Sequence, residues 1–78
     1  MQKIYKALIG NQTVYKIIDE SDFISYISID DDSTPKKITF LSNDNGRFTG
    51  YDFIEQDKSI FSDYSPWVKR VLHGRFKI

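Results

Sequence analysis

The chain lacks cysteine entirely, which excludes disulfide bonds, thiolate nucleophiles, zinc fingers and iron–sulfur clusters as a group. A domain that relies on no disulfide fits a reducing compartment, so we expect a cytoplasmic protein. The first residues have no apolar run of the kind that secretory signals carry. No stretch approaches the roughly 20 apolar residues of a membrane helix, and we therefore expect no membrane association.

Residues suited to catalysis are also scarce. The one histidine, His73, would have to serve any catalytic triad, and none of the serines stands in a Gly-x-Ser-x-Gly elbow. The four glycines form no phosphate-binding loop. Asp30, Asp31 and Asp32 are neighbours in one polar stretch, without the contrasting environments of an acid–base pair or the ligand spacing of a calcium loop. We expect a non-enzymatic protein without metal or cofactor.

Charge is balanced overall but segregated along the chain. The formal net charge is zero, whereas residues 19–35 contain no base and residues 64–78 contain no acid. The candidate partner-binding residues are therefore an acidic set, Asp19, Glu20, Asp22, Asp30, Asp31 and Asp32, and a basic set, Lys69, Arg70, His73, Arg75 and Lys77. Each set is either a docking face or a solvated surface. As a docking face, its like-signed charges would raise the rate of encounter with an oppositely charged partner.

Three kinds of partner follow from this segregation. A protein partner is the leading hypothesis, because no catalytic set is assembled. Nucleic acid is the alternative, through the basic C-terminal residues and the aromatic side chains beside them. The acidic face of one copy could also meet the basic helix of another, which would make a homo-oligomer.

Two runs of β-branched and aromatic residues open the chain, at 3–9 and 13–19. Gly10 between them can supply the positive φ of a tight turn, so we predict a β-hairpin. Residues 23–29 fit both a helical stripe and strand alternation. Their isoleucines and tyrosine favour a strand, because such side chains fit a pleated surface.

Asn45 and Gly46 form the clearest turn signal, between apolar runs at 36–42 and 47–53. Asn-Gly suits the two positive φ angles of a type I′ turn, which predicts a second hairpin. In that register Ile38 would face Phe53, and Phe40 would face Tyr51. The preceding stretch, 30–35, is predicted to be a loop.

Ser65 and Pro66 are typical of a helix start, and Gly74 of a helix stop, which predicts a helix over about 65–73. Its apolar arc would pair Trp67 with Val71 and Val68 with Leu72, which places Trp67 in the core. Residues 54–64 are predicted to be a loop anchored by Ile60 and Phe61, and residues 75–78 a last short strand.

These patterns together predict a single domain of residues 1–78 with an α+β fold. It would consist of a small antiparallel sheet or partly open barrel of four or five strands with one short C-terminal helix. The wealth of Ile, Lys, Asp and Phe against a single alanine indicates an AT-rich coding genome. A small regulator or inhibitor from a phage or a low-GC bacterium would have this size and composition.

Overall fold

A computed structural model describes all residues from Met1 to Ile78. Five antiparallel strands form one sheet in the order β4-β3-β2-β1-β5, and one helix follows them near the C-terminus. The elements are β1 (Lys3–Ile9), β2 (Gln12–Ile18), β3 (Ile24–Asp30), β4 (Lys37–Leu41), β5 (Ile54–Gln56) and α1 (Pro66–Phe76), with short 3₁₀ turns η1 (Asp44–Gly46) and η2 (Lys58–Phe61). The predicted α+β fold is confirmed.

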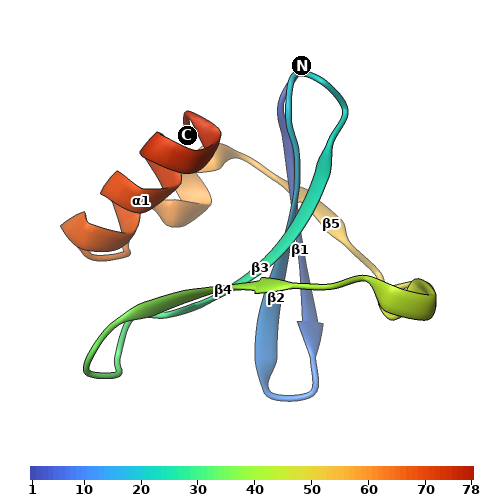
Figure 1. Ribbon diagram of the computed structural model, residues 1–78, viewed down its shortest axis with the longest axis horizontal. Helices are drawn as coiled ribbons and strands as arrows, with labels where there is room; N and C mark the ends of the chain where they lie inside the picture. The colour runs from blue at the N-terminus through green and yellow to red at the C-terminus, as the bar shows by residue number, and fades with distance from the viewer.

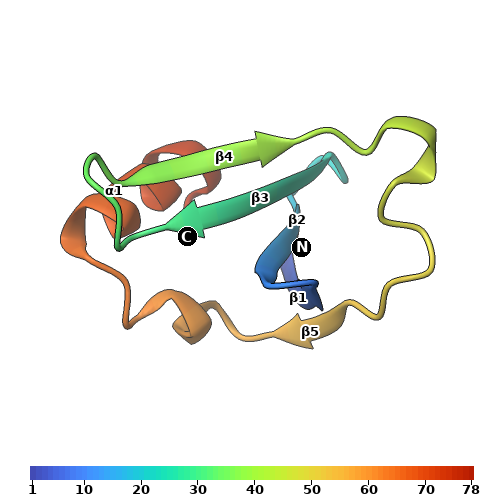
Figure 2. The same ribbon diagram turned by 90° about the horizontal axis from the view of Figure 1, so that it is seen from below.

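The sheet is strongly twisted and remains open. In Figure 1, β4 runs across the direction of β1 and β2. Figure 2 shows β4 and β5 on opposite sides of the molecule, joined on the right by residues 42–53, while α1 lies at the left. The two edge strands do not pair with each other. The helix is too short and too polar to cross a membrane.

The first hairpin and the third strand follow the predictions. Gly10 has φ of +62° at the turn, and β1 and β2 pair from Lys3↔Ile18 to Ile9↔Gln12. Residues 24–30 are a strand that pairs with β2 on one side and β4 on the other. The β-branched content of this stretch therefore decided between the two patterns.

The core lies between one face of the sheet and the helix. Val68, Leu72 and Phe76 recur every four residues on α1, and all three are buried against the sheet. The sheet contributes Ile17 and Ile27, which are 1% and 0% exposed. Phe61 of η2 fills the same cluster, as the sequence predicted for this anchor.

The helix differs from its prediction at both its C-terminal end and its outer face. Gly74 continues the helix, which ends only at Phe76, and Lys77 takes the left-handed cap conformation with φ of +61°. The strand predicted for residues 75–78 is therefore wrong. Trp67 is 38% exposed rather than part of the core, because the buried stripe is centred on Leu72 and leaves Trp67 outside it.

The second predicted hairpin is also wrong. Asn45 and Gly46 do have positive φ, 56° and 66°, but they lie in η1, and residues 47–53 form no strand. Phe48 instead stacks on Tyr26 at 4.5 Å between ring centroids, on the sheet face opposite the helix. Phe48 is 5% exposed there, so its ring is buried against the sheet, and β4 has β3 as its only strand neighbour.

The stretch predicted as a loop, 54–64, contains a strand. Ile54 to Gln56 pair with Lys6 to Ile4 of β1 and form the second edge of the sheet. Three residues with one exposed charge carry too little periodicity to be recognised in the sequence. The strand is detectable only from its position beside β1.

Candidate interaction surface

The six acidic candidates lie at the two ends of β3. Asp19, Glu20 and Asp22 belong to the β2–β3 turn, whereas Asp30 is the last residue of β3 and Asp31 and Asp32 follow it in the β3–β4 loop. The seven residues of β3 separate the two groups by about 20 Å at the usual rise of a strand. The acidic residues therefore form two surfaces and not one continuous face.

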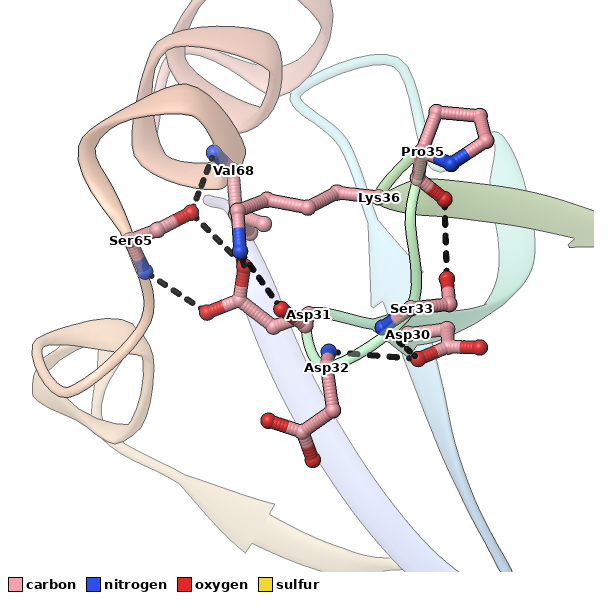
Figure 3. A network of polar contacts seen from close by, with 8 residues as sticks. All are labelled: Asp30, Asp31, Asp32, Ser33, Pro35, Lys36, Ser65 and Val68. Carbon is pink, nitrogen blue, oxygen red and sulfur yellow. Dashed lines mark hydrogen bonds and ion pairs between the residues drawn. The ribbon is translucent and has the colours of Figure 1, made fainter.

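Asp31 is occupied by contacts within the protein. Its carboxylate accepts the backbone N–H of Ser65 at 2.8 Å and the Ser65 hydroxyl at 2.7 Å, as Figure 3 shows. The same hydroxyl oxygen accepts the Val68 N–H at 3.5 Å, so Ser65 is the predicted N-cap of α1. Lys36 Nζ lies 3.4 Å from the carboxylate. Asp31 thus holds the start of the helix to the β3–β4 loop.

These contacts change the acidity of Asp31. Hydrogen bonds from the hydroxyl and the backbone N–H of Ser65, together with the nearby Lys36 ammonium, lower the pKa of the Asp31 carboxyl. Asp30 is also engaged, because its carboxylate accepts the N–H groups of Asp32 and Ser33. Of the three adjacent aspartates, Asp32 alone has a carboxylate without a hydrogen bond inside the protein.

The basic candidates are spread around α1 instead of forming one patch. Lys69, Arg70 and His73 share one arc of the helix, as predicted, and all three are exposed. Lys69 Nζ donates to the Ser62 carbonyl at 3.3 Å, and His73 Nδ1 lies 3.2 Å from the Ile78 carbonyl oxygen. Arg75 lies on another side of the helix, over the ring of Phe40.

One end of the molecule brings acidic and basic candidates together. Asp19 and Glu20 of the β2–β3 turn line a hollow with Arg75 and Lys77 from the end of α1. No ion pair forms across this hollow. The opposite charges are close enough to reduce each other's field, which weakens both as isolated docking faces.

The structure assembles no group of metal-ligating side chains. No three His, Asp or Glu side chains come together as a set that could bind a metal ion. His73 lies at the exposed end of the helix, where its ring Nδ1 lies beside the Ile78 carbonyl.

The buried Tyr15 hydroxyl forms a hydrogen bond with the Tyr64 hydroxyl at 2.7 Å, and burial together with this bond raises the pKa of Tyr15.

An exposed apolar patch lies where β3 begins and β4 ends. Phe23 is 68% exposed, Ile24 46% and Phe40 48%. They line a hollow of about 420 Å³ together with Tyr26, Leu41 and Arg75, among others. The guanidinium of Arg75 lies 4.8 Å from the centre of the Phe40 ring. We call Phe23, Ile24, Phe40 and Arg75 the apolar patch.

The backbone at this patch is firmly held. The Asp19 carboxylate accepts the N–H groups of Ser21 and Phe23, and the Asp19 N–H donates to the Phe23 carbonyl at 3.0 Å. Asp22 in this turn has φ of +63°, a conformation that non-glycine residues adopt at some cost. The turn therefore presents the large ring of Phe23 to solvent from a fixed position.

The patch is exposed because β4 stops before it reaches the first residues of β3. β3 pairs with β2 from Ile24 onward, but its pairing with β4 begins only at Tyr26, opposite Leu41. Ile24 and Ser25 consequently have a strand neighbour on one side only. The sequence does carry a signal for this surface, since Phe23, Ile24, Tyr26, Ile27 and Ile29 occupy both faces of the strand, more than one buried face requires.

A comparison with known protein families, with curated proteins and with solved structures found no match for this chain.

Proposed function

We propose that this protein is a non-enzymatic protein-interaction module that binds its partner through the apolar patch. The observation that carries the proposal is the exposure of two phenylalanines and an isoleucine around one hollow. Contiguous exposed apolar groups of this kind, with polar surroundings, are typical of protein-binding sites.

The composition of the patch supports a protein partner. Aromatic and arginine side chains are enriched among the residues that dominate binding energy at interfaces. Phe23 is held by the hydrogen bonds of its turn, so little backbone entropy would be lost when it is buried by a partner. Arg75 has no carboxylate partner within the protein and could pair with one from the partner.

A capture experiment with matched variants tests this proposal. We expect Phe23→Ser to abolish recovery of a protein partner that the wild-type chain captures from native lysate and that mass spectrometry identifies. Leu8→Ser is the control, because Leu8 is an exposed apolar residue outside the patch. Equal recovery with wild type and Phe23→Ser would contradict the proposal.

The nucleic-acid alternative has its own supporting observation. Trp67 is partly exposed, and Lys69, Arg70 and His73 near it form no ion pair. An accessible ring beside cations could stack on a base. In that case affinity for single-stranded DNA would fall steeply with added salt, and Trp67→Ala would weaken it. No binding at low salt would remove this alternative.

Within the same proposal the module acts in the cytoplasm as an accessory regulator or inhibitor of its partner. The absence of cysteine supports the compartment, and the small size together with the exposed apolar patch supports the role. A partner enzyme whose activity changes on adding this protein, and not on adding Phe23→Ser, would establish it.

A further inference from the structure

The two edges of the sheet differ in how they are protected. β5 is three residues long and contains the exposed Glu55, and the Gln56 side chain donates a hydrogen bond to the Ile54 carbonyl at 3.2 Å. Short length, charge and side-chain cover are the usual means of preventing an edge strand from pairing. β5 is therefore a closed edge.

β4 has none of these protections along its centre. Ile38, Thr39 and Phe40 are uncharged, and proline is absent from the strand. Hydrogen bonds from its backbone go only to β3, and no side chain bonds its outer groups. β4 is the end strand of the sheet, and Figure 2 shows no further strand beyond it, with α1 behind its left half.

We propose that two copies of this chain pair through β4, antiparallel and with Thr39 on the two-fold axis, to form a continuous ten-stranded sheet. This inference concerns assembly and goes beyond the proposed partner-binding function. A two-fold contact requires that the same surface be complementary to itself. The residues of β4 meet that requirement in this register.

The cross-strand pairs follow from counting outward from Thr39. Ile38 of one copy would lie opposite Phe40 of the other, and this apolar pair would occur twice. Phe40 and Ile38 lie on the helix side, because their β3 neighbours are Ile27, a core residue, and Ile29, which packs against the core. An aromatic ring beside a β-branched side chain is a favourable pair on a sheet.

The other face of the strand is compatible with the same register. Thr39 would lie opposite its own copy, and two threonines in this position can hydrogen-bond. Lys37 would lie opposite Leu41, so no like charges face each other. The zero net charge of the chain adds no long-range repulsion between copies. The pairing thus satisfies both faces at once.

The proposed pairing leaves the rest of the apolar patch accessible. Ile24 lies four residues along β3 from Ser28, the neighbour of Thr39, which is about 13 Å at the rise of a strand. Phe40, and Leu41 which lines the same hollow, would be shared between the two contacts. The dimer would present two copies of Phe23, so Phe23→Ser should not change self-association.

Sedimentation equilibrium over a wide concentration range tests the inference. We expect the wild-type chain to approach twice the monomer mass, and Thr39→Lys to weaken association about tenfold or more, because two lysines would meet on the axis. Thr39 is exposed, so the variant should fold, as circular dichroism can check. Thr49→Lys, the same change at an exposed threonine outside β4, should associate like the wild type.

Complementary charges provide a second test. Thr39→Glu should weaken association to a similar extent, whereas an equal mixture of Thr39→Glu and Thr39→Lys should form mixed dimers because opposite charges would then meet. A wild-type chain that stays monomeric at every concentration would overturn the inference. A dimer that Thr39→Lys leaves intact would also overturn it, and sensitivity of that dimer to salt would place the contact at the charged faces instead. Loss of partner capture by Phe23→Ser with an unchanged dimer separates this inference from the proposed function.

Discussion

The core between the sheet and the helix and the apolar patch are built from the same residue types, but the core is buried and the patch is exposed to solvent. In the core Ile27 and Leu72 are almost completely buried, while at the patch Ile24 is 46% and Phe23 68% exposed. The difference arises from cover, since α1 lies over one face and β4 stops short of Ile24. Apolar character alone therefore does not identify the core, because topology decides which apolar residues find a partner.

The largest expected effect lies on the helix side. Leu72→Ala should lower the free energy of unfolding by roughly 2–5 kcal/mol, because it removes a fully buried side chain and leaves a cavity among its neighbours. Urea denaturation measures this. Leu8→Ala makes the same chemical change at an exposed position and should cost far less. Equal losses would show that the two regions do not differ as described.

The link between the helix and the β3–β4 loop should have the next largest effect. Ser65→Ala removes the hydroxyl that caps the helix and bonds Asp31, at a cost of about 0.5–2 kcal/mol in the free energy of unfolding. Ser62→Ala is the matched control, because the Ser62 side chain makes no hydrogen bond. A change no larger than that of the control would mean that the cap does not stabilise α1.

Acid should reveal the role of Asp31 separately. Because its folded-state pKa is lowered, ionised Asp31 stabilises the fold above the unfolded pKa near 3.8, and this contribution is lost as pH falls toward the folded value. Asp31→Asn should therefore lower Tm at neutral pH and flatten the decline of Tm in acid. Asp32→Asn, which removes a carboxylate without a hydrogen-bond partner, should reproduce the wild-type profile.

The smallest effect on stability is expected at the patch. Phe23→Ser should change the free energy of unfolding by no more than about 0.5 kcal/mol, since the ring is mostly in solvent. Thermal denaturation compared with Leu72→Ala measures the contrast. A loss of stability comparable to that of Leu72→Ala would show that Phe23 belongs to the core and would remove the basis for a binding surface.

The sequence analysis succeeded where the signal was local. Gly10 marks a real turn, Ser65 and Pro66 start a real helix, and the isoleucines of β3 favour the strand that is found. The sequence analysis failed where a local turn signal and the apolar run after it were overridden by contacts between segments distant in the chain. Asn45 and Gly46 have the predicted positive φ, yet no hairpin forms, and Phe48 packs on Tyr26 of β3 instead of lying in a strand beside β4.

The candidate site divides in the same way. The segregation of charge was visible in the sequence. The sequence did not show that Asp31 bonds Ser65 at the start of the helix, or that β3 separates the acidic residues into two groups. The apolar patch was missed, because a strand that is apolar on both faces normally indicates burial on both sides. Whether such a residue is covered depends on where the neighbouring strand ends.

By itself the amino-acid sequence determined the absence of cysteine chemistry, the first hairpin, the third strand and the start of the helix, since these depend on composition or on a few adjacent residues. Only the tertiary structure decided the partner of β4, the existence of β5, the end of the helix and the exposure of Phe23. These features arise from contacts between segments distant in the chain, whose free energies outweigh local preference.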